Sequence, residues 1–296
     1  MSCLHCQTEQ YLLNEKMDKE ALQDLKDQID GEGDAVLKQQ LQSKRNILKT
    51  EITLEKTIEK SLSRSKAQLI KTVKEVLKGG RGQYILALSP ADLKSFLLRN
   101  GLADAVSDFE TSQLNISNYV NEMVRVYEPQ FNISSSPILP SIFSRTSESL
   151  FDDLIIQQTS RSLKDAVYNS SLIGADVAIK QMQDELDSST GKQVSEARTK
   201  ISQYSRSITS EAANIAGLEY YIYTGPKDGI TRPVCRELVG KVLSESQIKK
   251  LGNGSSLISG GGYNCRHSWS PISKSYLKVK NIEPISEEEI KRINKL

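Results

Sequence analysis

The residues that most enzyme and metal sites require are scarce in this chain. Among its 296 residues there are two histidines, four cysteines and one tryptophan, and aromatic residues make up only 6%. His5 and His267 lie far apart, which excludes the zinc-protease pattern of two histidines one helical turn apart. A GxxxxGK[ST] phosphate loop, a GxGxxG fingerprint between a strand and a helix, and a GxSxG elbow are also missing. We therefore expect a protein without enzymatic activity.

Long apolar runs are missing too. No stretch approaches the roughly 18 apolar residues of a membrane span, and the N-terminus lacks the basic-then-apolar pattern of a signal peptide. These absences predict no membrane partner and assembly in a cytoplasm, where cysteines are more often thiols or metal ligands than disulfides. Charged residues make up 26% of the chain and hydrophobic ones 38%, which suits long, partly exposed helices.

Charge is abundant and unevenly distributed. Residues 1–37 hold nine acids against three lysines, whereas residues 38–81 hold twelve Lys or Arg against four Glu, a net charge of +8. Residues 227–281 carry a net charge of +7. Basic blocks of this size indicate contact with a polyanion, contact with the acidic blocks, or simply solvated helix faces.

Hydrophobic periodicity predicts a largely helical chain up to about residue 218. Apolar residues at helical spacing run from 34 to 78 and stop at the glycines that follow. Ser89 and Pro90 begin a helix that ends at Asn100-Gly101. Helical patterns return over 107–128 and 148–218, with a linker expected at 132–144 and a break at 187–192.

The pattern changes after Gly217, where aromatic and β-branched residues, turn residues and short strands follow one another. The fold class predicted is α+β, mostly α, with long N-terminal helices, a helical segment and a small C-terminal antiparallel β-sheet. We expect three parts: a helical region at 1–135 with an acidic stretch (1–37) and a basic helix (38–81), a second domain at 136–275, and a tail with a short helix at 276–296.

Rare residues gather in "GGYNCRHSWSPI", residues 261–272. On a strand, Cys265, His267 and Trp269 alternate and project to one side, and Cys235 from upstream could reach the same face. Two cysteines and a histidine are zinc-competent ligands, and a fourth would come from the N-terminal "CLHC", Cys3 or Cys6. One alternative is that the cysteines are buried apolar groups packing against Trp269, whose partners on adjacent strands would be Tyr220, Ile222, Cys235 and Val242. The other is that the cysteines pair in a disulfide after release from the cell.

The segment "EYYIYTGPKDGITRPVCRELVGKV", followed by "GGYNCRHSWSPI", resembles the phage minor head protein family, also called phage Mu F-like or head-morphogenesis proteins. That family has an Asp–x–x–Thr–Arg–x–x–Cys turn, a Gly–Lys–Val strand and an Asn–Cys–Arg segment. The matching residues are Asp228, Thr231, Arg232, Cys235, Gly240, Lys241, Val242, Asn264, Cys265 and Arg266. Many members place His before the Asn and another Cys after the Arg, where this chain has Tyr263 and His267. The resemblance covers about residues 140–275.

The resemblance implies a non-enzymatic virion protein of a tailed bacteriophage, present in few copies near the portal vertex and assembled in the host cytoplasm. Its partners would be the portal protein, the major capsid or scaffold protein, and genomic double-stranded DNA. Its work would be in head morphogenesis, DNA packaging or ejection. The motif residues would be structural: Asp228 would pair with Arg232 across the turn, Asn264 and Arg266 would bond the neighbouring backbone, and Thr231, Gly240 and Trp269 would complete the same unit.

Two other functions stay open at this stage. One is a DNA-binding module without sequence preference that uses the basic helix 38–81, and the other is a small zinc-stabilised interaction domain. No cofactor other than zinc is expected. The candidate DNA contacts are the bases along that helix: Lys44, Arg45, Lys49, Lys56, Lys60, Arg64, Lys71 and Lys74.

Overall fold

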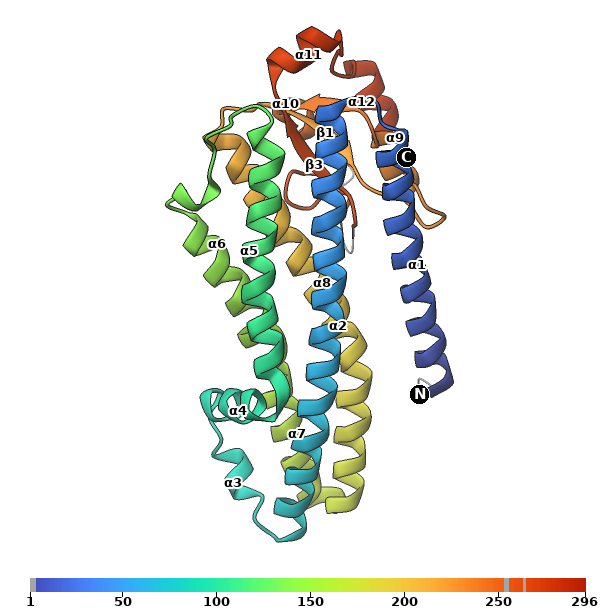
Figure 1. Ribbon diagram of the computed structural model, residues 1–296. Coiled ribbons are helices and arrows are strands. Elements are labelled where there is room, and N and C mark those ends of the chain that lie inside the picture. Colours follow the sequence, from blue (N-terminus) through green and yellow to red (C-terminus); the bar gives the residue numbers. More distant parts are fainter. Residues whose placement is uncertain (1–3, 253–255, 263–264) are drawn as a thin grey trace. The chain divides into compact units, whose positions relative to one another are not determined.

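The computed structural model describes residues 4–252, 256–262 and 265–296, with side chains from residue 16 onward. Five long helices dominate it: α1 (Leu4–Gly31), α2 (Ala35–Lys78), α5 (Ala103–Arg125), α7 (Gln158–Ile173) and α8 (Ala175–Ile215) (Figure 1). Short helical segments lie between them: α3 (Gln83–Leu86), α4 (Pro90–Leu97), η1 (Leu98–Leu102), η2 (Ile133–Ser135), α6 (Leu139–Ser147) and η3 (Glu148–Gln157). None of the described helices combines the length and apolarity that crossing a bilayer requires.

The C-terminal part contains the strands. In chain order it holds β1 (Tyr220–Thr224), α9 (Pro233–Leu238), β2 (Val242–Ser244), α10 (Glu245–Ile248), β3 (Ser268–Ile272), α11 (Lys274–Lys280) and α12 (Glu287–Ile293). The strands form one antiparallel sheet in the order β2-β1-β3. The predicted fold class, α+β and mostly α with a small C-terminal antiparallel sheet, is confirmed.

Two compact units make up the chain. Unit 1 combines Met1–Ile52, Gln113–Phe143 and Ile201–Leu296, and unit 2 combines Thr53–Ser112 and Ser144–Lys200. This grouping does not follow the divisions expected at 135 and 275. The reason is that α2, α5 and α8 each contribute one part of their length to unit 1 and the other part to unit 2.

The sheet of unit 1 is buried on both faces. Tyr223 on β1 lies opposite Trp269 on β3, and both join the large core cluster of the unit together with Tyr221, Cys235 and Leu243. The expected neighbours Tyr220, Ile222 and Val242 belong to the opposite face, where Ile222 and Val242 pack with Ile272 and Leu277. Alternation along β1 explains this correction, because Tyr221 and Tyr223 share a face from which Ile222 is excluded. Of the four predicted partners of Trp269, only Cys235 shares its cluster.

Helix α8 corrects another expectation, since it runs without a break through 187–192. The hydroxyls of Ser188, Ser189 and Thr190 donate to carbonyls three or four residues back in the same helix, so these residues do not end it. The chain instead breaks at Gly174, which has φ 88° between α7 and α8. A glycine takes this left-handed conformation without the steric cost that other residues meet.

The expected linker at 132–144 is also structured. It contains η2 and the start of α6, and the Ile133 side chain is fully buried. The Ile133 amide donates to Asn121 Oδ1 at 2.7 Å, and Ser136 Oγ donates to Glu211 Oε1 at 2.6 Å. The serine and proline content had predicted a linker, whereas side-chain hydrogen bonds hold this segment in an ordered structure.

In unit 2 the predicted helix at 89–101 has the expected punctuation. Ser89 caps α4 and forms a capping box with Asp92, and Pro90 takes the first helical position. Gly101 has φ 121°, which ends the regular helix before α5 begins. Phe109 and Phe151 meet edge to face with ring centroids 5.6 Å apart, in the apolar interior of this unit.

Candidate functional site

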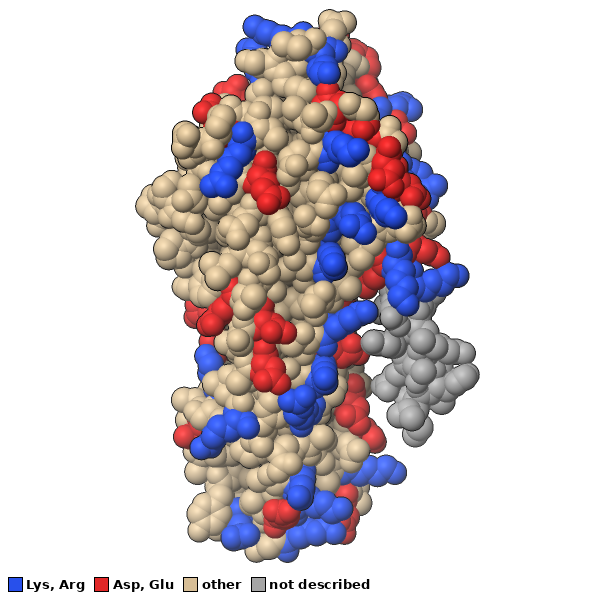
Figure 2. Space-filling view, viewed as in Figure 1, with Lys and Arg blue, Asp and Glu red and all other residues tan. Residues whose placement is uncertain are grey.

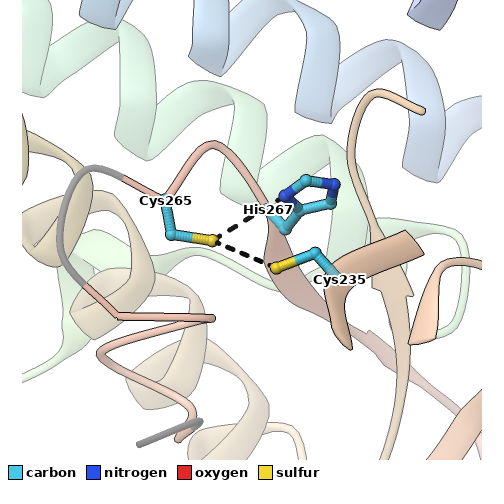
Figure 3. A group of neighbouring side chains, drawn as sticks. All are labelled: Cys235, Cys265 and His267. Atoms are coloured by element: carbon cyan, nitrogen blue, oxygen red, sulfur yellow. Dashed lines mark hydrogen bonds between the residues drawn. The ribbon is translucent and has the colours of Figure 1, made fainter. Parts of the chain in front are cut away.

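Three side chains with metal-ligating atoms meet in the interior of unit 1 (Figure 3). Cys235 comes from α9, and Cys265 and His267 come from the segment that leads into β3. Their Sγ and ring nitrogen atoms lie within 4.8 Å of one another. The two sulfurs are 3.9 Å apart, and Cys265 Sγ lies 3.7 Å from His267 Nδ1. All three side chains are buried.

The alternation of residues had predicted that Cys265, His267 and Trp269 lie on one strand. The site forms without that arrangement. Strand β3 begins only at Ser268, so Cys265 and His267 belong to the preceding irregular segment. Three consecutive glycines, residues 260–262, lead into that segment, and Gly260 and Gly262 have φ values of 58° and 98°. The close approach of the three ligand atoms therefore comes from this turn and from α9, rather than from the pleat of a sheet.

The ring of His267 is fixed by two neighbours. Its Nε2 lies 2.7 Å from the carbonyl oxygen of Pro226, which can only accept, so Nε2 carries the proton. The other ring nitrogen, Nδ1, faces the sulfur of Cys265. The imidazole also stacks on Tyr223, with centroids 5.4 Å apart and planes 6° from parallel. A histidine that donates from one ring nitrogen to a backbone carbonyl and turns the other toward a cysteine has an arrangement common among metal ligands.

The two thiols interact through a hydrogen bond. Cys235 donates to Cys265, and this hydrogen bond lowers the pKa of Cys265 against the opposing effect of burial, with further help from His267 and Arg206. The same hydrogen bond and burial raise the pKa of Cys235. The Gly261 amide also donates to Cys265 Sγ at 3.1 Å. The lowered pKa of Cys265 favours its thiolate, the form in which cysteine binds metals.

Tyr223 occupies the remaining side of the cluster. Its hydroxyl lies 3.5 Å from Cys235 Sγ and 3.7 Å from Cys265 Sγ. Burial raises the pKa of Tyr223 well above its usual value, so the hydroxyl stays protonated. A Cβ on Gly261 would lie 2.5 Å from Cys235 Sγ, so only glycine fits beside the thiols. Two sulfurs and a nitrogen are a donor set that suits zinc.

An ion pair joins the two parts of the sequence motif. Asp228 and Arg266 meet at 2.6 Å with little exposure of either side chain. The hydroxyl of Thr231 donates to Asp228 Oδ1 and to the Pro226 carbonyl, both at 2.9 Å. Burial raises the pKa of Asp228, but the hydrogen bonds from Arg266 and Thr231 outweigh it and leave the pKa lowered.

The other arginine of the motif has a different task from the one expected. The sequence had suggested that Arg232 pairs with Asp228, whereas Arg266 fills that role and Arg232 Nη1 donates to the Gly261 carbonyl at 2.6 Å. Arg266 also contacts backbone outside its own neighbourhood, with Nη1 3.4 Å from the Met17 carbonyl. Gly240 has φ 87°, and its amide donates to the Tyr223 carbonyl at 2.9 Å, so it positions α9 beside β1.

Arg206 on α8 was missed by sequence reasoning. Its guanidinium donates to four backbone carbonyls of the segment around the cysteine, those of Ile258, Ser259, Cys265 and His267. The sequence signal was an arginine among the apolar residues Ile201, Tyr204 and Ile208 of the helix, which a charge count treats as exposed. In the structure Arg206 holds in place the glycine-rich turn that leads to Cys265.

The candidate DNA contacts fall into two groups. Lys44 is a correction: it is only 2% exposed, and burial lowers its pKa to about 8 against the raising effect of Glu51. Arg45 is half-buried and donates to the Leu22 carbonyl. The exposed candidates are Lys49, Lys56, Lys60, Arg64, Lys71 and Lys74, of which Arg64 pairs with Asp104.

Some of the candidate residues cannot be placed. Cys3 and Asn264 lie outside the described residues, and for Cys6 only its place in α1 is described. The proposed fourth ligand from "CLHC" therefore stays a prediction.

Comparison with known proteins adds no relative: no family model, no curated protein and no solved structure matches this chain.

Proposed function

We propose that this chain is a non-enzymatic minor head protein of a tailed bacteriophage, located near the portal vertex. The observation that carries the proposal is that the motif resembling the minor head family forms one interlocked unit. Asp228 and Arg266, from its two halves, form a buried ion pair, and Cys235 and Cys265, also from its two halves, are in contact. Residues 30 or more positions apart that match a pattern and also meet in space support that pattern as a real structural unit.

The enclosure of the reactive groups supports a structural role for this unit. Cys235, Cys265 and His267 are 1%, 6% and 3% exposed. The ring of Tyr223, the Gly261 backbone and the clamp of Arg206 surround them. A nucleophilic cysteine needs access to its substrate, and this geometry would give that access only after the glycine turn opens.

Mass spectrometry of purified proheads and mature heads from a phage that encodes this protein tests the proposal. The expected result is a chain present in few copies per particle, retained through washing at high salt. Absence from both kinds of particle would contradict it. The portal protein and genomic DNA are the proposed partners, and the exposed lysines of the 53–78 part of α2 are the proposed DNA contacts.

We also propose that Cys235, Cys265 and His267 bind a zinc ion that stabilises unit 1. The spacing of the three ligand atoms, the position of the His267 ring and the lowered pKa of Cys265 favour it. Elemental analysis of protein refolded with zinc should find about one metal per chain, and a chelator should lower the melting temperature. Protein that holds no zinc, and whose melting temperature a chelator leaves unchanged, would show that the thiols only pack.

A further inference from the structure

Unit 2 concentrates its exposed large apolar side chains at one place. They are Tyr84, Leu86 and Leu88 in and after α3, and Tyr168, Leu172, Ile173 and Val177 at the junction of α7 and α8. Every exposed large hydrophobic residue of this unit belongs to one of these two short segments. We call residues 84–88 and 168–177 the apolar tip of unit 2.

The two segments of the apolar tip lie side by side. Helix α3 packs against α7, and a Cβ on Gly82 would lie 3.1 Å from the Val167 side chain. Lys78, at the end of α2, pairs with Asp176, in the first turn of α8, at 2.8 Å. These contacts hold the loop after α2 against the α7–α8 turn, so the two segments that carry the seven apolar side chains are neighbours. Exposed apolar side chains gathered on neighbouring segments often mark an interaction site.

The charges around the apolar tip point to the kind of partner. Residues 71–91 and 161–180 hold seven Lys or Arg and three Asp or Glu, a net charge of +4, and all ten side chains are exposed. Figure 2 shows Lys and Arg beside the tan surface at the lower end of the view, where α3 lies. A second copy would bring the same positive charge against it, and like charges across an interface are costly.

We propose that the apolar tip docks on another virion protein, into an apolar recess with an acidic rim. This proposal rests on the proposed function, because it gives the minor head protein its contact in the particle. A protein fits better than an anionic membrane because Asp165 and Asp176 stand among the bases. Individual side chains of a protein can match both signs, whereas a layer of anionic headgroups would repel the carboxylates.

The test compares two matched double variants in a phage that lacks its own copy of the gene. Tyr168→Ser with Leu172→Ser removes two apolar side chains from the tip, each about two-thirds exposed at 67% and 65%. Leu114→Ser with Val279→Ser removes two apolar side chains that are more exposed, 69% and 82%, from unit 1. All four residues are exposed, so both proteins should keep the circular dichroism spectrum and melting temperature of the wild type.

Copies per purified particle are then measured by quantitative mass spectrometry. The tip variant should be reduced about tenfold or more, as when central interface residues are truncated, and the unit 1 variant should equal the wild type. Equal incorporation of the tip variant overturns the docking proposal while leaving the proposed function intact. Absence of the wild-type protein from particles overturns both.

Two further arms exclude the other occupants. Reversing the rim with Lys164→Glu and Lys180→Glu should also reduce incorporation, and a rim variant that enters particles as well as the wild type would contradict an acidic partner. Flotation with vesicles of 70% phosphatidylcholine and 30% phosphatidylglycerol should leave the wild-type protein unbound. Tip-dependent vesicle binding, or self-association in sedimentation that the tip variant abolishes, would replace the virion protein by a membrane or a second copy.

Discussion

Replacing Trp269 by alanine tests whether the cysteine-containing segment is part of the core that holds unit 1 together. Trp269 is 2% exposed, and its ring lies 4.5 Å from that of Tyr223, centroid to centroid. It joins the cluster that contains Tyr221, Cys235 and Leu243. Burial of a tryptophan removes roughly 150–250 Å² from water, and Trp→Ala substitutions in cores typically cost about 3–5 kcal/mol.

One feature of the site moves the expected cost of Trp269→Ala toward the lower end of this range. The indole Nε1 of Trp269 has no hydrogen-bond acceptor among the described residues. A buried donor without a partner costs roughly 1–3 kcal/mol, and alanine removes that penalty together with the packing. We therefore expect Trp269→Ala to cost about 3 kcal/mol in the free energy of unfolding.

The matched control is Trp269→Phe, which keeps an aromatic ring against Tyr223 and removes the unpaired N–H. Its expected cost is below about 1.5 kcal/mol, typical of conservative core substitutions. Urea unfolding followed by circular dichroism at 222 nm suits both variants, because Trp269 is the only tryptophan and its fluorescence is lost in each. Should Trp269→Ala unfold within about 1 kcal/mol of the wild type, the segment would not be part of a cooperative core.

Three further expectations concern other parts of the chain. Arg206→Met leaves four carbonyls without their donor and should lower the free energy of unfolding by on the order of 3 kcal/mol. Arg206→Lys should have an intermediate effect. Unchanged urea midpoints would contradict the role of Arg206 in holding the turn. Burial raises the pKa of Asp34, but the ion pair with Lys280 and the hydrogen bond from the Leu37 amide outweigh it and lower the pKa to about 2. The stabilisation is therefore present above the ordinary 3.8 and is lost as the pH falls through 2. The stability difference between wild type and Asp34→Asn should therefore shrink between pH 5 and pH 2, and a constant difference would refute this coupling. Binding to double-stranded DNA of random sequence should fall with salt on a log–log slope of about −5 if about six phosphates are neutralised, and Lys→Glu changes at Lys56, Lys60, Lys71 and Lys74 should abolish it, whereas a flat salt response would exclude this contact.

Local signals predicted much of the helical structure. The apolar stripe and the following glycines placed the second helix at 34–78, and the structure has Ala35–Lys78. The capping residues Ser89 and Ser244 both form the capping boxes that their sequences indicate. Signals of this kind depend on interactions between residues three or four positions apart, which a sequence displays directly.

Burial on those helices was harder to predict. Leu41 belongs to the apolar residues at helical spacing in α2, yet it is only half-buried, while Gln40 and Lys44 on the same helix are almost completely buried. Gln40 donates to the Met123 carbonyl at 2.9 Å, and Lys44 lies near Glu51. A carbonyl on another helix compensates for burying Gln40, and an acidic residue on the same helix does so for Lys44. Hydrophobicity alone does not show such partners.

The sequence predicted which residues form the candidate site, but not how the fold brings them together. Cys235, Cys265 and His267 were identified from residue type and spacing, and the structure brings them together. The contributions of Tyr223, the Pro226 carbonyl and Arg206 depend on long-range geometry, since each belongs to another element of the fold. Asp228 was predicted to pair with Arg232, the arginine nearer to it along the chain. The sequence shows such separations, but not that the fold brings Arg266 beside the turn.

The most direct test of the account is a localised cryo-electron microscopy reconstruction of the portal vertex in proheads of the phage that encodes this protein. The account predicts density at that vertex into which unit 1 fits, with a three-stranded antiparallel sheet and the contact of Cys235 with Cys265 and His267 recognisable within it. A well-resolved vertex with every density explained by other proteins, together with density for this chain elsewhere or nowhere in the particle, would contradict it.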